Sequence, residues 1–311
     1  MNSSTCTNCG TTLIGRWCHA CGQQRIDREQ RRLRHLFGQF FQALTDLDSR
    51  FWRSLIALLF RPGLLSRDYL DGRRVRWMSP VALFLLGSLV YFLAPGLSDF
   101  QLSFVEQVNA DIAMQALPHP ERLTDAQREA IRRDHPRQVH SDRVQPWIEA
   151  RVGERQRELQ RRDPSARYTV RDYAQAYDSA AGEISKPLML IHLPLLALVL
   201  QGLFFWRRML FAEHFVVAAH MFAFLLLFIE LVVLPSGWLT TQMFGSANVP
   251  APIKLAVLGL LVIHIALTLR RVYRIGIVWA VPAAVTALAL LMLISVHVYR
   301  PLQFMLVFAL T

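Results

Sequence analysis

Residues 61–93 decide the fold of this chain, and they read RPGLLSRDYLDGRRVRWMSPVALFLLGSLVYFL. The motif 61–63, Arg-Pro-Gly, ends a helical pattern, because proline disfavours helix at the residue before it and glycine relaxes the backbone. The run 73–76 then carries three arginines, and residues 78–93 carry no charge. With Trp77 in front, this apolar run predicts a first transmembrane helix of about 18–20 residues over 78–95.

The composition agrees with a membrane protein that has polar parts. The chain has 311 residues, of which 53% are hydrophobic and 18% charged, which is too apolar for an ordinary soluble domain. Its net charge is +11, and all of its basic residues are arginine except Lys186 and Lys254. Such an excess invites a nucleic-acid interpretation, but in a membrane protein it more often reflects topology and anionic lipid. We therefore regard nucleic acid as an unlikely partner.

All four cysteines lie before residue 22, in two C-x-x-C-G units. Four thiolates can close a tetrahedral shell around Zn²⁺, and a glycine after each second cysteine can adopt the positive φ of a tight knuckle. Residues 1–25 are thus predicted to form a structural zinc ribbon, with a small hairpin over Thr11–Trp17, and His19 as a bystander. The predicted metal ligands are Cys6, Cys9, Cys18 and Cys21.

Two other chemistries fit the same spacing. A rubredoxin-like iron site uses similar knuckles, and two disulfides would serve in an oxidising compartment. A shell of four protein thiolates leaves no open position for catalysis. The use of the ribbon is then recognition of a protein partner or of nucleic acid, or simple anchoring of the fold.

Residues 26–77 are expected to form a basic linker followed by amphipathic helices. Apolar residues recur at a helical period from Leu33 to Leu59, with a break and a helix cap near Asp48 or Ser49. A transmembrane segment follows closely, which favours helices that lie in the membrane interface. The alternatives are helices packed on the membrane bundle and a soluble core helix.

A polar insert at 96–186 and a second apolar region at 187–311 complete the chain. The insert is predicted to be a small helical domain, with capping boxes that begin at Thr124 and Thr169. Residues from Leu302 onward are apolar but too short to span, and we expect them to pack on the bundle or lie in the interface. Four further segments are long enough to cross a bilayer, namely 187–206, 215–234, 253–269 and 275–298. The predicted fold class is an all-α polytopic membrane protein of about five transmembrane helices, with an N-terminal zinc ribbon and an extramembrane helical insert.

Charge predicts the orientation of these spans. Residues 1–77 carry 13 arginines and 6 acids, whereas residues 96–186 carry 14 basic residues and 15 acids. Arginines also lie in the turns at 207–208 and 270–274, and the loop 235–252 has no basic residue. The inside-positive bias therefore places the N-terminus in the cytoplasm, and the insert and the C-terminus in the periplasm, of a bacterial inner membrane.

Three ionisable residues are expected at similar depth in the predicted bundle. His192, Glu230 and His297 could form an intramembrane polar cluster that holds a metal ion or protons, because such groups are costly in lipid and turn toward partners. The plainer interpretation is interhelical hydrogen bonding. The sequence holds no H-E-x-x-H, no G-x-S-x-G and no phosphate-binding glycine loop. We expect no enzyme.

The order of these features resembles a bacterial family of uncharacterised multi-pass membrane proteins, a domain of unknown function. The resemblance lies in the paired C-x-x-C-G units, in Arg61-Pro62-Gly63, and in residues 69–77, Tyr-Leu-Asp-Gly-Arg-Arg-Val-Arg-Trp, where Trp77 replaces the usual tyrosine or phenylalanine. It covers about residues 5–93. It implies an inner-membrane protein and no activity.

Three functions follow as hypotheses. The first is a non-enzymatic membrane protein whose cytoplasmic ribbon binds or positions a protein partner. The second is a transporter or channel that uses polar residues of the last four spans, and the third is an enzyme acting on lipid or envelope substrates through the insert. The sequence does not indicate an oligomeric state.

Overall fold

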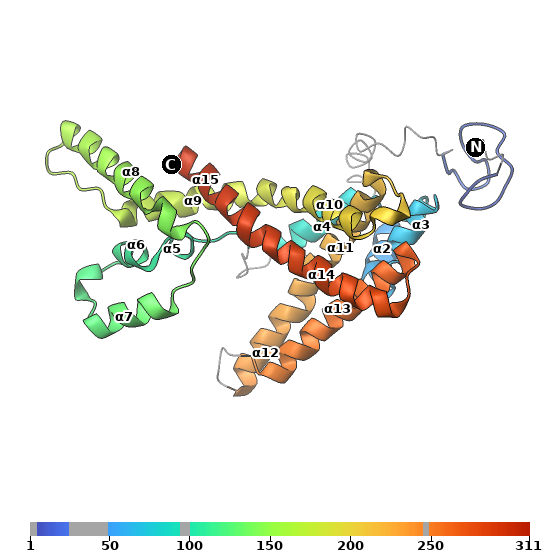
Figure 1. Ribbon diagram of the computed structural model, residues 1–311. Coiled ribbons are helices and arrows are strands. Elements are labelled where there is room, and N and C mark those ends of the chain that lie inside the picture. Colours follow the sequence, from blue (N-terminus) through green and yellow to red (C-terminus); the bar gives the residue numbers. More distant parts are fainter. Residues whose placement is uncertain (1–4, 25–48, 94–99, 245–248) are drawn as a thin grey trace. The chain divides into compact units, whose positions relative to one another are not determined.

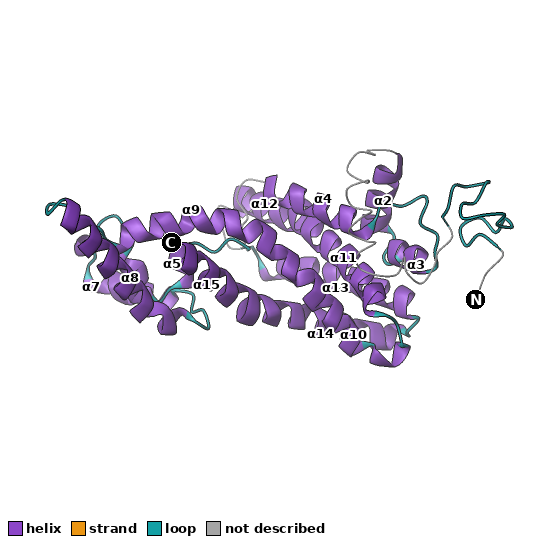
Figure 2. Ribbon diagram, turned by 90° about the horizontal axis from the view of Figure 1, so that it is seen from above, coloured by secondary structure: helices purple, strands orange, loops and turns teal. Residues whose placement is uncertain are grey.

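The computed structural model describes residues 5–24, 49–93, 100–244 and 249–311. Within these ranges the regular structure is helical, with two isolated β-bridges and no strand, which confirms the all-α prediction (Figures 1 and 2). Part of the predicted linker and interfacial helix, residues 26–48, lies outside the described residues. The helices are α2 (Ser49–Phe60), α3 (Leu64–Leu70), α4 (Pro80–Leu93), α5 (Phe104–Gln107), α6 (Ala110–Gln115), η2 (Pro120–Arg122), α7 (Asp125–Asp134), α8 (Ser141–Arg162), α9 (Val170–Leu188), η3 (Met189–Ile191), α10 (His192–Leu203), η4 (Phe205–Arg207), α11 (Phe211–Phe228), η5 (Ile229–Val233), α12 (Leu234–Phe244), α13 (Ala251–Tyr273), α14 (Ile277–Ile294), η6 (Ser295–Tyr299) and α15 (Arg300–Leu310).

Four helical stretches are long and apolar enough to cross a membrane. They are Val170–Leu203, Phe211–Met243, Ala251–Tyr273 and Ile277–Leu310. Two of them have 34 residues, which at 1.5 Å per residue is about 50 Å and exceeds the hydrocarbon thickness of about 30 Å. The first predicted span appears as α4, a shorter apolar helix of 14 residues. The described chain is thus a membrane protein with four candidate spans and one shorter apolar helix.

The chain divides into two compact units, each formed by two separate segments. Unit 1 comprises Met1–Leu97 and Leu193–Leu291, and unit 2 comprises Ser98–His192 and Met292–Thr311. The predicted domain boundaries stay predictions. At the C-terminus these two units differ from the predicted domains. The last 20 residues group with the insert instead of with the apolar segments before them.

In unit 1, α4 packs closely against α11, and Figure 1 shows the two helices crossing. Gly87 permits the close approach, because a Cβ at this position would lie 3.3 Å from the carbonyl oxygen of Ala223. The rings of Phe84 and Phe222 meet beside the crossing with centroids 5.7 Å apart. The sequence therefore buries α4 inside the unit through one small residue and a neighbouring aromatic pair.

The Arg-Pro-Gly turn joins the same unit to α13. Gly63 has φ of 71°, and a Cβ there would lie 2.9 Å from the carbonyl oxygen of Thr268. Arg271 Nη1 donates to the carbonyl oxygen of Pro62 at 2.7 Å. Glycine at position 63 is thus required twice, by its left-handed backbone and by the close approach of α13.

Unit 2 has its own core, which is rich in aromatic rings. Phe104 lies 5.5 Å from both Tyr173 and Tyr177, and Tyr177 lies 5.7 Å from Phe304, as measured between ring centroids. Phe304 belongs to α15, which packs along α9 in both views of the molecule. One face of the C-terminal stretch from Leu302, with Gln303, Phe304 and Val307, is therefore buried in the insert, in contrast to the expected packing on the bundle or in the interface, because this apolar face fits the aromatic face of α9.

Two helices of the insert begin where the sequence predicts. Thr124 starts α7 and Thr169 starts α9, each with a complete capping box, to Gln127 and Asp172 respectively. A third box begins at Ser103 and was not predicted. These caps satisfy backbone N–H groups that the first helical turn leaves without partners.

Candidate metal centre and polar sites

The ribbon consists of two knuckles that repeat the same backbone hydrogen bonds. The amide of Gly10 donates to the carbonyl of Cys6, and the amide of Gly22 donates to the carbonyl of Cys18, both at 2.8 Å. Both glycines have positive φ, 77° and 70°, as the spacing predicts. The predicted hairpin over Thr11–Trp17 does not form in this described segment. Instead, one β-bridge closes each knuckle, Thr5 with Thr12 and Trp17 with Gln24.

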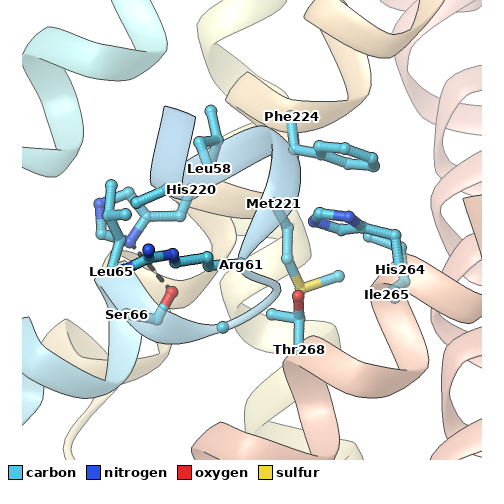
Figure 3. Close-up of a pocket in the computed structure, with 12 residues that line it drawn as sticks. Leu58, Arg61, Leu65, Ser66, His220, Met221, Phe224, His264, Ile265 and Thr268 are labelled. Carbon is cyan, nitrogen blue, oxygen red and sulfur yellow. Dashed lines mark hydrogen bonds between the residues drawn. The ribbon is translucent and has the colours of Figure 1, made fainter. Parts of the chain in front are cut away.

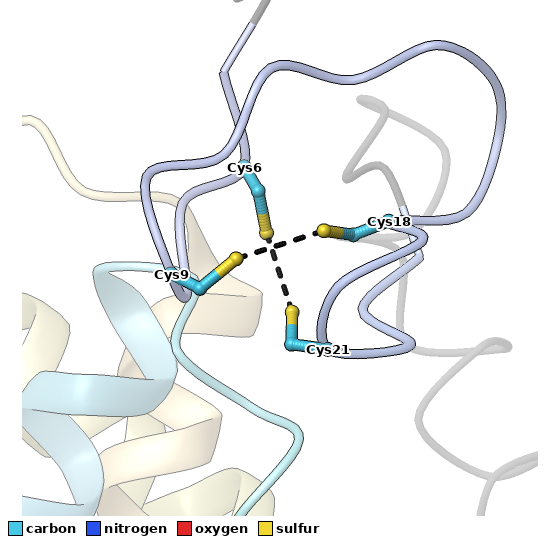
Figure 4. A group of neighbouring side chains, drawn as sticks. All are labelled: Cys6, Cys9, Cys18 and Cys21. Atoms are coloured by element: carbon cyan, nitrogen blue, oxygen red, sulfur yellow. Dashed lines mark hydrogen bonds between the residues drawn. The ribbon is translucent and has the colours of Figure 1, made fainter.

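The knuckles bring four sulfur atoms to one point. Figure 4 shows the side chains of Cys6, Cys9, Cys18 and Cys21 converging, and their Sγ atoms all lie within 4.8 Å of one another. The Sγ atoms of Cys6 and Cys21 are 3.6 Å apart, as are those of Cys9 and Cys18. A disulfide is about 2.05 Å long, whereas a tetrahedron with arms of about 2.3 Å has edges of about 3.8 Å. The four donors therefore fit one tetrahedral metal ion, which would cross-link the two knuckles.

The thiols differ in how readily they lose a proton. The pKa of Cys9 falls to about 6, because the hydroxyl and backbone N–H of Thr11 stabilise its thiolate. The Oγ1 atom of Thr11 lies 3.3 Å from the Sγ atom. Burial raises the pKa of Cys6 to about 11. Cys9 is also the exposed member of the set.

Two large apolar side chains of the ribbon point to solvent. Ile14 is 87% exposed and Trp17 is 61% exposed, and both lie in the turn between the knuckles. Cys6 and Cys18 are buried, together with Gln23. The small buried interior is therefore made of metal ligands, while the apolar groups of the ribbon lie outside it.

A second polar centre surrounds Asp68, in the segment that decides the fold. Its carboxylate accepts hydrogen bonds from Arg73 Nη2 at 2.7 Å, Arg76 Nη2 at 2.6 Å and Trp77 Nε1 at 3.0 Å. Burial alone raises the pKa of this carboxyl, but the donors Arg73, Trp77 and Arg76 outweigh burial, so the pKa lies below its usual range. The arginine run is thus a clasp around one buried aspartate. From the sequence these arginines were interpreted only as a topology signal, although Asp68 lies five residues before Arg73 and eight before Arg76.

A hydrogen bond couples α3 to α11 beside this clasp. Ser66 Oγ and His220 Nδ1 are 3.0 Å apart and both side chains are buried (Figure 3). The pocket between them and His264, whose ring stacks on Phe224 at 3.5 Å, has a volume of about 10 Å³, which is room for about one water molecule. A serine nucleophile needs access for a substrate. This pair is therefore a structural link between helices.

Of the predicted intramembrane residues, His192 has a complete set of partners. Its Nδ1 lies 3.1 Å from the carbonyl oxygen of Met189, and its Nε2 lies 3.0 Å from Ser295 Oγ. The ring of Tyr299 covers it with a centroid distance of 4.7 Å. These contacts match the plainer interpretation of this histidine, in which it links two helices of unit 2 by hydrogen bonds.

Glu230 and His297 lie in separate units, and each lies in a π-helical turn. Glu230 is in η5, and its Oε1 is buried with no hydrogen-bond partner among the described residues. His297 is exposed in η6, and its Nδ1 lies 3.1 Å from the carbonyl oxygen of Leu293. The joint cluster of His192, Glu230 and His297 remains a prediction. No pattern in the sequence predicts these π-helical turns.

A comparison with protein families matches residues 48–92 to the family described as Protein of unknown function (DUF3667). The matched segment contains α2, α3, the Asp68 clasp and most of α4. It is less than half of the chain, and it agrees with the resemblance to a domain of unknown function. The match does not include the cysteines. No curated protein and no solved structure matches the chain.

Proposed function

We propose that this chain is a non-enzymatic protein of the bacterial inner membrane whose zinc ribbon faces the cytoplasm and binds a protein partner. The observation that carries the proposal is the exposed pair Ile14 and Trp17, held on a turn between two metal knuckles. A ribbon that served only as a folding anchor would have no use for a tryptophan turned to solvent. Aromatic side chains of this kind are typical anchors of protein interfaces.

The chemistry of the centre supports a binding role over a catalytic one. The four cysteines fill every position of a tetrahedral shell, so no site is left for a substrate or a reactive water. The charge distribution supports the proposed orientation, because arginines dominate the N-terminal region and the turns at 207–208 and 270–274. In the reducing cytoplasm the thiols stay available to the metal.

The test uses the full-length protein with three variants of the ribbon. Cys9→Ser with Cys21→Ser should abolish bound zinc, measured by elemental analysis of the purified protein. In cells treated with a chemical cross-linker, Trp17→Ala should keep one zinc per chain but should no longer capture the protein partner that the unchanged chain captures. His19→Ala changes an exposed ribbon residue of no proposed role, and it should keep both. If Trp17→Ala and His19→Ala captured the same partners in equal amounts, the binding role would be wrong.

A second candidate, a transporter or channel, draws on the π-helical turns. Such turns occur frequently at functional sites, and both Glu230 and His297 lie in one. Flux of ions or small solutes into proteoliposomes, lost in Glu230→Gln and kept in Thr241→Ala, would favour this candidate. Absence of flux for all solutes tested would leave the binding function as the better proposal.

A further inference from the structure

A groove of about 380 Å³ opens at the C-terminal end of α13. Its volume lies in the range of small-ligand sites, about 300–1,000 Å³. Three apolar and three basic residues share its wall. The arginine groove, as we name it, is lined by Pro62, Leu267, Arg270, Arg271, Arg274 and Ile275.

No carboxylate within the described residues pairs with the charged groups of this groove. Arg270, Arg271 and Arg274 are exposed and form no ion pair with any residue in the described part of the chain. Two nearby carboxylates are already engaged. Asp71 pairs with Arg67 at 2.9 Å, and Glu213 accepts a hydrogen bond from the backbone N–H of Leu210 at 2.8 Å.

Two arginines at this end of α13 donate to backbone carbonyls. Arg271 donates to the Pro62 carbonyl at 2.7 Å, and Arg207 Nη2 donates to the Arg274 carbonyl at 3.2 Å. The bond from Arg207 satisfies one carbonyl oxygen at the C-terminal end of α13, where the helix dipole is negative and favours cationic side chains. A guanidinium carries five N–H groups, so Arg271 retains four donors for a ligand. The groove therefore presents three guanidinium groups, one of them held by the Arg-Pro-Gly turn, and guanidinium is the side chain best suited to bind phosphate oxygens.

The surroundings indicate which phosphate can reach the groove. The chain directly after it begins α14 with Ile277, Val278 and Trp279, of which Val278 is 75% and Trp279 is 73% exposed. An exposed tryptophan at the end of a candidate span is typical of the membrane–water interface. A ligand that placed its anion in the groove would have an apolar surface beside it for hydrocarbon chains.

We propose that the arginine groove binds the phosphate of an anionic phospholipid headgroup. Arg270 and Arg274 bind the phosphate oxygens, Arg271 bridges the ligand and the Arg-Pro-Gly turn, and the acyl chains lie against the exposed start of α14. The site is separate from the zinc ribbon and does not depend on its function. It gives the arginine pair of this turn a ligand in addition to its role in topology.

The test titrates the full-length protein in detergent with short-chain phosphatidylglycerol and, in parallel, with the phosphatidylcholine of the same chain length. Native mass spectrometry counts the bound lipids. We expect the anionic lipid to bind about tenfold more tightly, and Arg270→Gln with Arg274→Gln to remove that preference, since two charge-assisted contacts are lost. Arg157→Gln with Arg161→Gln removes the same charge from exposed positions of α8 and should change nothing.

Three results would overturn the proposal. The groove variant could bind phosphatidylglycerol as the unchanged protein does, or the α8 control could lose as much affinity, which would indicate net charge alone. Inorganic phosphate could displace the lipid at equal concentration, which would indicate a site for free phosphate. If the double variant fails to fold, Ile275→Trp decides, because it fills the groove while keeping every charge and should also weaken binding about tenfold.

Discussion

The cysteine ribbon and the helical insert are both polar parts of a membrane protein, but they are held together by different means. The ribbon buries hardly more than two of its ligands and leaves its apolar side chains, Ile14 and Trp17, outside. The insert buries a continuous cluster of side chains that includes the rings of Phe104 and Tyr177. The C-terminal helix contributes Phe304 to this cluster. About 20 residues cannot bury a core, and a metal ion bound to the four cysteines would supply the stability that buried apolar area supplies in the insert.

The largest effect that separates the two regions is removal of the metal. Treatment with a strong chelator should unfold residues 5–24 and leave the insert folded, because apparent zinc-binding energies of about 10–16 kcal/mol are folding energy in such sites. Hydrogen exchange measured over Cys6–Gln24 and over Phe104–Tyr177 reports the two regions separately. Equal protection of the ribbon with and without metal would show that it has another source of stability.

Truncation of a side chain in the aromatic core should destabilise the insert and leave the ribbon folded. Phe304→Ala removes a fully buried ring from unit 2 and should destabilise it by about 3–5 kcal/mol, while zinc content stays unchanged. Leu310→Ala on the same helix is the control, because Leu310 is 73% exposed. Pulse proteolysis of the purified variants gives the free energies. If Phe304→Ala lowered the free energy of unfolding no more than Leu310→Ala does, α15 would contribute little to the core of the insert.

The insert should also carry an acid sensitivity that arises from one buried histidine. Burial, and secondarily Arg300, lowers the pKa of His140 to about 4 from 6.5, and neither ring nitrogen has a hydrogen-bond partner among the described residues. At pH values between about 4 and 6.5, His140 is therefore protonated in the unfolded chain and neutral in the folded one. The contribution of neutral His140 is full above pH 6.5 and is lost as pH falls toward 4, by about 3 kcal/mol.

His140→Leu should remove that part of the pH dependence. Unfolding of the variant and of the unchanged protein is compared at neutral and mildly acid pH, so that the contributions of His119 and His135, present in both, cancel. As the solution is acidified, the free energy of unfolding of the unchanged protein should fall relative to that of the variant. A constant gap at all pH values would contradict the role of His140.

The smallest effect concerns a helix start. Thr169→Ala removes the cap of α9 and should cost about 1 kcal/mol, whereas Thr169→Ser should cost almost nothing. Ser179→Ala lies in the interior of the same helix, where its hydroxyl bonds back to the carbonyl of Gln175, and it should be neutral. Thermal unfolding of the three variants measures the order. If Thr169→Ala and Ser179→Ala lowered the stability equally, the Thr169 cap would contribute nothing specific to the stability of the insert.

Much of this architecture could be predicted from local patterns. The two C-x-x-C-G units predict the convergence of four sulfur atoms, and Thr124 and Thr169 predict the starts of two helices, because each of these signals lies within a few residues of chain. Apolar runs predict the candidate spans for the same reason. Contacts between distant segments left no such signal, which is why the pairing of α15 with α9 and the Ser66–His220 bond were missed.

The sequence by itself determined that this is an all-α membrane protein with a four-cysteine centre near its N-terminus. Composition, hydropathy and spacing act locally, and they need no partner from elsewhere in the chain. Only the tertiary structure decided that Asp68 gathers Arg73 and Arg76, that the C-terminal helix completes the core of the insert, and that the arginines after α13 line a groove. Each of these depends on which face of a helix meets another segment, and that is set by packing over distances that no local pattern records.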